Sequence, residues 1–175
     1  MRQPLEDRVV TISRARFSVE YPASLMLVAS MNPCPCGYYN HPTKDCVCAP
    51  GVVQNYLNKI SGPLLDRIDI HIEVTPVSFD ELTDDREGEP SITIRERVID
   101  ARILQEDRFK DQGHLHCNAQ MASNEVKKIC EIDEDGHELL KTAMDRLNLS
   151  ARAYDRILKV ARTIADLAKS DNVKT

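Results

Sequence analysis

The hydrophobic positions divide the chain into a first region that predicts strands and a second region that predicts helices. β-Branched and aromatic residues at 9–13 and 17–21 flank a basic turn at 14–16, which is typical of a β-hairpin. The continuous apolar run at 25–30 predicts a strand buried on both faces of a parallel sheet. Apolar and polar residues alternate at 68–74, which predicts a half-exposed strand near a sheet edge.

Other hydrophobic positions recur at helical intervals. A short helix is predicted at 52–60. In the second region, the spacing at 93–96 is that of a capping box. The helix that follows would bury a stripe made of Ile94, Val98, Ala101 and Leu104. The apolar stripes of this region indicate a small helical bundle, with further helices at 123–131, 133–148 and 150–169.

An acidic segment separates the two regions. Residues 76–90 contain Pro and Gly besides their acidic side chains, which predicts a linker between parts at 1–75 and 91–175. Residues 80–89 carry six acidic side chains and one arginine, and their charge of −5 equals the net charge of the whole chain. The other residues balance to zero, so the acidic total does not exclude a local basic patch that binds phosphate.

The composition favours a folded, cytoplasmic protein. Hydrophobic residues make up 42% of the chain, which excludes a disordered or collagen-like protein. No window approaches the roughly 18 consecutive apolar residues of a membrane span. Residues 1–7 lack the apolar region of a signal peptide. We therefore expect a soluble chain without a membrane partner.

The cysteines are the strongest metal-ligand pattern. Without a secretory signal, cysteines are better interpreted as metal ligands or reduced thiols than as disulfides. Two CxC pairs separated by nine residues, with His41 between them, could close a tetrahedral Zn²⁺ site. Reduced thiols without a metal are the main alternative. The remaining two cysteines, Cys117 and Cys130, lie elsewhere and are predicted to be structural. The candidate zinc ligands are Cys34, Cys36, Cys46 and Cys48.

Asn32 directly follows the predicted strand at 25–30. It would then lie at the carboxyl end of a sheet, where open α/β folds bind ligands. A neutral amide at this point can orient a water molecule or contact a phosphate oxygen. The alternative is that Asn32 and Pro33 only form a turn.

Two arginines also occupy positions suited to phosphate. Arg67 stands at the start of the strand predicted at 68–74. A guanidinium at such a position can reach a neighbouring subunit and stabilise a transferring phosphoryl group. The alternative is a surface ion pair with Asp66 or Asp69. Arg152 lies in the first helical turn after a predicted Ser150 N-cap, a combination that makes an anion site. Its alternative is a solvated side chain.

The 175 residues contain no GxxxxGK[ST] loop, so they provide no phosphate cradle of that kind. They also show no Ser-His-Asp arrangement. The first region has too few strands to close a parallel sheet by itself.

Several segments together resemble the Mg-chelatase-like AAA+ ATPases of the ComM/YifB type. The resemblance covers nearly the whole chain, and its most specific parts are the strings NPCPCG at 32–37 and SGPLLDRIDIHIEV at 61–74. It implies an α/β fold, namely a partial AAA+ P-loop NTPase core with a β-hairpin and a Cys-rich insertion, followed by an all-α helical lid bundle. It also implies ATP and Mg²⁺ as cofactors, assembly into a ring, expected to be a hexamer, and action on branched DNA.

The resemblance assigns a role to each candidate residue. Asn32 resembles the sensor that positions the attacking water, and Arg67 resembles the finger offered to a neighbour's ATP. Arg152 resembles a second sensor in the helical lid. Arg14 and Arg16 would tip a hairpin that contacts DNA phosphates, which gives affinity without sequence preference.

The family's phosphate loop and Mg²⁺-binding strand precede the position that matches Met1. We therefore expect this chain alone neither to hydrolyse ATP nor to bind it tightly. Two alternatives remain open at the level of sequence. One is the ATPase subunit of a true magnesium chelatase, and the other is a non-catalytic, zinc-stabilised interaction module.

Overall fold

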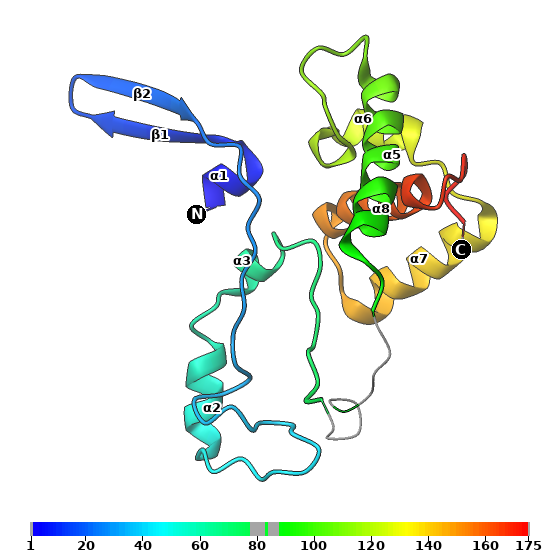
Figure 1. The fold of residues 1–175 in the computed structure, drawn as a ribbon. Coiled ribbons are helices and arrows are strands. Elements are labelled where there is room, and N and C mark those ends of the chain that lie inside the picture. Colours follow the sequence, from blue (N-terminus) through cyan, green and yellow to red (C-terminus); the bar gives the residue numbers. More distant parts are fainter. Residues whose placement is uncertain (1, 78–82, 84–87, 175) are drawn as a thin grey trace. The chain divides into compact units, whose positions relative to one another are not determined.

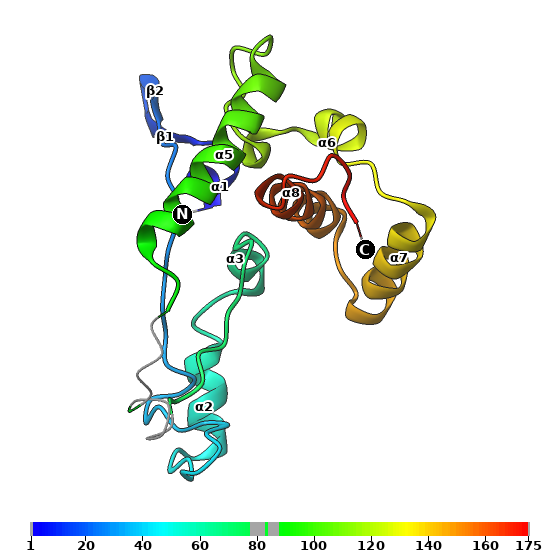
Figure 2. The same ribbon diagram turned by 45° about the vertical axis from the view of Figure 1, so that its right-hand side comes forward.

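The computed structural model describes residues 2–77, 83 and 88–174, and the chain divides into two compact units. Unit 1 comprises Met1–Asp84 and unit 2 comprises Asp85–Thr175 (Figure 1, Figure 2). Much of the predicted linker at 76–90 lies outside the described residues. None of the helices in the described part is long and apolar enough to cross a membrane.

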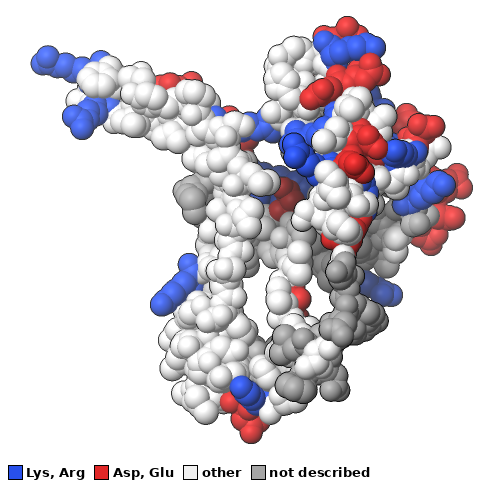
Figure 3. Space-filling view, viewed as in Figure 1, with Lys and Arg blue, Asp and Glu red and all other residues white. Residues whose placement is uncertain are grey.

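Unit 1 begins with a short helix and the predicted hairpin. Helix α1 (Arg2–Glu6) leads into strands β1 (Val9–Arg14) and β2 (Phe17–Pro22), which pair antiparallel with Arg14 opposite Phe17. The Gln3 side chain holds α1 on β1, because its Nε2 donates to Thr11 Oγ1 at 2.7 Å and its Oε1 accepts from Thr11 N at 3.2 Å. The hairpin prediction is confirmed, and Figure 3 shows basic side chains at its far end.

The predictions of strands at 25–30 and 68–74 are wrong for this structure. Neither segment forms a strand, and most of their apolar side chains are exposed to solvent, with Met26 88% and Ile72 80% exposed. A strand needs a neighbour to satisfy its backbone N–H and C=O groups. Among the described residues the sheet consists of β1 and β2 alone, so these two segments have no strand to pair with.

Two further helices complete unit 1. Helix α2 (Pro50–Leu57) confirms the helix predicted at 52–60, and Pro50 favours its start because a proline ring suits the first helical position. Helix α3 (Gly62–Leu65) is a single turn just before Arg67. Among the described residues of unit 1, only Cys34 and Val53 are buried.

Unit 2 is helical, as its hydrophobic periodicity predicts. It contains the following elements: α5 (Ser91–Phe109), the 3₁₀ turn η1 (Asn118–Gln120), α6 (Ser123–Ile129), α7 (Glu134–Leu147) and α8 (Ala151–Leu167). Helix α8 packs on α5, η1 and α6. The predicted Ser150 cap of α8 is present, since its side chain accepts from Ala153 N at 3.3 Å. At the start of α7, the Asp133 side chain accepts from Gly136 N at 2.8 Å, a cap that was not predicted.

The predicted start and buried face of α5 are wrong. The helix begins at Ser91 after Pro90, rather than at a capping box formed by Thr93. Of the predicted stripe only Ala101 is buried, and the other three side chains are at least 40% exposed. The hydrophobic core instead gathers residues from five segments: Phe109, Leu115, Met121, Val126, Cys130, Leu140 and Leu158.

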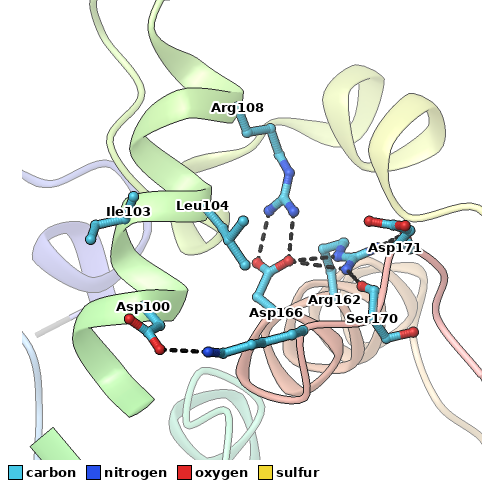
Figure 4. A pocket seen from close by; sticks show the side chains of 9 residues that line it. Asp100, Ile103, Leu104, Arg108, Arg162, Asp166, Ser170 and Asp171 are labelled. Atoms are coloured by element: carbon cyan, nitrogen blue, oxygen red, sulfur yellow. Dashed lines mark hydrogen bonds and ion pairs between the residues drawn. The ribbon is translucent and has the colours of Figure 1, made fainter. Parts of the chain in front are cut away.

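A buried polar network joins α5 to α8 (Figure 4). Asp166, 1% exposed, accepts two hydrogen bonds from Arg108 at 2.8 and 2.5 Å and one from Asn118 at 2.7 Å. Arg162 Nε donates to the same carboxylate at 3.0 Å, and its other nitrogens donate to the carbonyls of Ser170 and Asp171. The hydrophobic pattern did not predict this network, although two of its members interrupt the apolar stripe of α8.

Candidate functional site

The four cysteines of the two CxC pairs lie together at one point of unit 1. Cys34 Sγ is 3.3 Å from Cys36 Sγ and 3.7 Å from Cys46 Sγ, and the last two sulfurs are 3.5 Å apart. Cys48 completes the group, and all four sulfurs lie within 4.8 Å of one another. All six cysteines of the chain are free thiols, which leaves a metal site or reduced thiols as the alternatives.

The backbone between the pairs folds through two tight turns that bring the sulfurs together. Gly37 N donates to Cys34 O at 3.0 Å, and Gly37 has a φ of +84°, a conformation that glycine adopts without strain. His41 N donates to Tyr38 O at 3.1 Å in the second turn. The glycine after the first CxC pair therefore reverses the chain toward the second pair.

His41 belongs to the scaffold of this loop. Its Nδ1 accepts from Thr43 N and Lys44 N, each at 3.1 Å, and its ring packs edge-on against Tyr38. The Lys44 ammonium lies 5.0 Å from the centre of the Tyr38 ring, a cation–π contact. These contacts hold the loop between the two pairs, and the ligand group itself consists of cysteines alone.

The thiols influence one another's ionisation. The backbone N–H of Tyr38 is the main cause that lowers the pKa of Cys36 to about 6, with smaller contributions from Cys34 and Cys48. At Cys46 the backbone N–H of Cys48 also lowers the pKa, but burial and the neighbouring sulfurs outweigh it and raise the pKa to about 12. Closely spaced thiols cannot all ionise without a cation, because each thiolate repels the next.

Outside this group, Cys130 is a core residue. Burial raises the pKa of its thiol to about 11, against the opposing charges of Arg162 and Arg108. At 3% exposure it packs within the hydrophobic core of unit 2. Cys117, the residue before η1, is partly exposed.

Asn32 lies in the irregular segment that follows β2, two residues before the first cysteine, and its side chain is exposed. The strand that should precede it is absent, so its predicted position at the end of a sheet does not apply to this structure. In the sequence, Pro33 alone separates Asn32 from Cys34, the first residue of the cysteine group.

Arg67 is held by a residue that sequence reasoning missed. Its Nη2 lies 2.7 Å from Glu6 Oε1, and its Nη1 donates to Pro63 O. The Arg67 side chain is 11% exposed, and its Nε is buried without a hydrogen-bond partner among the described residues. The alternative considered from sequence was a surface ion pair with Asp66 or Asp69. The observed partner, Glu6, lies 61 positions before Arg67 in the sequence. No local pattern predicts such a contact.

Arg152 is the second residue of α8 and is exposed. The Ser150 side chain accepts a hydrogen bond from one of the free N–H groups at the start of this helix. The other N–H groups of the first turn lie near the Arg152 backbone. Asn32 and Arg67 belong to unit 1 and Arg152 belongs to unit 2.

The hairpin ends in two exposed arginines. Arg14 is the last residue of β1 and Arg16 lies in the two-residue turn. Ser13 and Ser18 pair across the strands at 2.9 Å just before the turn. The exposed guanidiniums extend from a narrow two-stranded arm, an arrangement that can contact a polyanion with little steric hindrance.

Comparisons with known proteins give a consistent result for both parts of the chain. Residues 1–82 match the sequence family described as magnesium chelatase, subunit ChlI, and residues 88–175 match the family of its C-terminal part. The competence protein ComM of Haemophilus influenzae is 43% identical over 95% of this chain, and the protein YifB of Escherichia coli is 40% identical over 98%. The chain spans about a third of the length of these curated relatives.

Proposed function

The chain belongs to the magnesium chelatase subunit ChlI family, and we propose that it forms the sensor and lid part of a ring-forming AAA+ ATPase of the ComM and YifB type. In this proposal the ring is a hexamer that couples ATP hydrolysis to the remodelling of branched DNA. The observation that carries it is the family match over both parts of the chain. The roles proposed for Asn32, Arg67 and Arg152 come from the resemblance of their sequence motifs to those of such ATPases.

The nucleotide is ATP with Mg²⁺, held by a phosphate loop outside these 175 residues. The chain itself contains no GxxxxGK[ST] sequence, and a lysine and backbone N–H groups of that kind hold the β- and γ-phosphates in such ATPases. The residues proposed here act on the triphosphate only after the loop has bound it. This chain alone therefore binds ATP weakly and does not hydrolyse it.

Asn32 is the sensor in this proposal. Its amide oxygen accepts a hydrogen bond from the attacking water and its nitrogen donates to a γ-phosphate oxygen, which places the water for in-line attack. A neutral amide does this without adding negative charge next to the phosphate. The exposure of its side chain supports this role, because the group is accessible to a nucleotide.

Arg67 is the finger that reaches the ATP of a neighbouring subunit. Its guanidinium stabilises the charge that develops on the transferring phosphoryl group, an effect worth about 10³ to 10⁵ in rate where it occurs. The Glu6 carboxylate and the Pro63 carbonyl orient the guanidinium on one side. The Nε is buried without a hydrogen-bond partner among the described residues, so the guanidinium reaches a further acceptor only if the side chain moves.

Arg152 is the second sensor and joins the helical unit to the same phosphates. A positive helix terminus and an exposed guanidinium both favour an anion at this point. When ATP becomes ADP and phosphate, this contact weakens. The helical unit can then change its position relative to the nucleotide, which is how hydrolysis would drive movement.

The hairpin tip contacts DNA in this proposal. Arg14 and Arg16 bind backbone phosphates, so that the ring can move along DNA of any sequence. Their exposure at the end of a narrow arm supports the assignment.

The test uses a chimera in which this chain replaces the matching third of Haemophilus influenzae ComM, hereafter the ComM chimera. We expect it to hydrolyse ATP and to be stimulated by forked DNA. The 175-residue chain alone should give no micromolar heat of binding when titrated with ATP and Mg²⁺. Tight binding by the chain alone would contradict the proposal, as would a folded, oligomeric chimera without ATPase activity.

A second candidate is the ATPase subunit of a magnesium chelatase, which inserts Mg²⁺ into a porphyrin. The description of the matching family favours it. Stimulation of the ComM chimera by porphyrin and not by forked DNA would support this candidate. Stimulation by neither, together with absent ATPase activity, would favour the non-catalytic interaction module.

A further inference from the structure

We propose that the cysteine cluster, defined by Cys34, Cys36, Cys46 and Cys48, binds one structural Zn²⁺ ion as a tetrathiolate site. The inference stands independently of the ATPase proposal, because it uses only the geometry and surroundings of the four sulfurs.

The spacing of the sulfurs fits a single ion. Four sulfurs at about 2.3 Å from a central Zn²⁺ in a tetrahedron lie about 3.8 Å from each other. Three of the distances in the cluster are 3.3, 3.5 and 3.7 Å, and no pair of the four exceeds 4.8 Å. These three pairs are slightly closer than the tetrahedral spacing, so a small outward displacement of their sulfurs separates the present arrangement from a metal-centred tetrahedron. A cluster of several iron atoms would hold its cysteines farther apart.

The surroundings explain why the loop needs a metal. Among the described residues of unit 1 only Cys34 and Val53 are buried, so that no hydrophobic core holds residues 34–48 in place. Four free thiols attract one another weakly, and their conformational entropy opposes the cluster. A structural metal supplies the missing free energy in small folds with little core.

The ligand set favours zinc over other divalent ions. Thiolates select Zn²⁺ or iron, whereas Mg²⁺ and Ca²⁺ prefer oxygen ligands. All four tetrahedral positions are taken by protein sulfurs, which is the arrangement of a structural site without an open position for catalysis. Binding the ion releases the remaining thiol protons to water.

The site has an orienting outer layer as well. The two turns and the His41 contacts fix the loop, and the Lys44 ammonium lies against Tyr38 beside it. Four thiolates and one Zn²⁺ carry a net charge of −2, so a nearby cation and backbone N–H groups are favourable. Asn32 precedes the first ligand by two residues, and α2 begins two residues after the last. The ion thus fixes the connection between Asn32 and α2.

The experiment measures metal in the 175-residue chain purified in reducing buffer. Elemental analysis should find about one zinc per chain, and Co²⁺ exchanged into the site should give the visible absorption of tetrahedral thiolate coordination. Cys36→Ser and Cys46→Ser should each lower the bound zinc to below about a tenth of the wild-type content. Cys117→Ser is the matched control and should retain all of it.

Because a ligand variant can unfold, a second measurement uses the wild-type chain. Stripping the zinc with a chelator should increase amide hydrogen exchange at 33–58 and leave α8 unchanged, and returning zinc should reverse the change. Purified protein without metal, mononuclear iron in place of zinc, zinc that persists in the Cys36 and Cys46 variants, or equal loss in Cys117→Ser would each overturn the proposal.

Discussion

Arg67 forms an ion pair with Glu6 at 2.7 Å, and in the sequence Glu6 ends helix α1 whereas Arg67 follows helix α3. The contact ties the turn before Arg67 to helix α1, so the direction of the guanidinium depends on a residue 61 positions away. The pair is partly exposed, at 11% and 34% of the two side chains. We therefore expect it to orient Arg67 more than it stabilises the fold.

Replacing Arg67 tests the finger. Arg67→Ala in the ComM chimera should lower the ATPase rate by about 10³-fold or more, because a transition-state charge loses its partner. Glu6→Gln should lower it only about fivefold, as expected for an orienting contact worth about 1 kcal/mol. Steady-state phosphate release measures both, with Arg95→Ala as an exposed control. An Arg67→Ala rate within tenfold of the unmodified chimera would remove the residue from the mechanism.

Replacing Arg152 tests the second sensor. Arg152→Ala should weaken ATP binding by the ComM chimera about 10- to 100-fold, since a charge-assisted hydrogen bond is worth about 1.5–3 kcal/mol. Equilibrium binding of a fluorescent ATP analogue measures the change. Arg146→Ala, an exposed arginine near the end of α7, is the control and should leave affinity unchanged. Equal affinity in both variants would exclude a nucleotide contact by Arg152.

The hairpin tip provides a test of DNA binding. The double variant Arg14→Ala and Arg16→Ala should bind DNA of every sequence more weakly. The slope of log affinity against log salt should become shallower by about 2, since each phosphate contact contributes about 0.9. Fluorescence anisotropy of labelled DNA over a salt series measures both the affinity and the slope. Lys127→Ala with Lys128→Ala removes the same charge from α6 as a control. An unchanged slope would contradict the assignment.

The buried network of unit 2 gives a stability prediction. Asp166→Ala should lower the free energy of unfolding by about 3–5 kcal/mol, because it leaves two buried or half-buried arginines without their carboxylate. Urea unfolding followed by circular dichroism measures it. Asp145→Asn, on the exposed face of α7, is the control and should stay within about 0.5 kcal/mol of wild type. A small effect of Asp166→Ala would show that the helices pack without the network.

The same carboxylate predicts a pH dependence. Burial alone raises the pKa of Asp166, but hydrogen bonds from Arg108 and Asn118 outweigh burial, and the net pKa lies below the ordinary value. Its contribution to stability is then fully present above the ordinary aspartate pKa of about 3.9 and is lost as pH falls through the lower folded value. Unit 2 should therefore lose stability in acid, and Asp166→Asn should flatten that loss. An identical acid slope in the variant would contradict the prediction.

Local sequence was sufficient for elements whose stabilising contacts are close in the chain. Short patterns predict the hairpin at Val9–Pro22, helix α7, and helix α8 with its Ser150 cap. The clustering of the four cysteines also follows from spacing, once Gly37 reverses the chain. In each case the partner lies within about fifteen residues.

Other features required the tertiary structure. The runs at 25–30 and 68–74 have strand-like patterns, yet a strand forms only where another strand accepts its hydrogen bonds. The buried line of α5, which is Ala101, Gln105 and Phe109, is set by the face that α8 covers. Periodicity identifies a helix but leaves its covered face undecided when apolar residues surround the axis.

Residue patterns alone are enough to predict the helical second unit, the hairpin with its basic tip, the cysteine group and the family. Long-range contacts set which residues hold Arg67, which polar side chains are buried around Asp166, and which apolar runs remain in solvent. The physical reason is the range of the interactions. Caps, turns and CxC pairs join near neighbours, whereas an ion pair over 61 positions or a carboxylate shared by α5 and α8 exists only after distant segments have met.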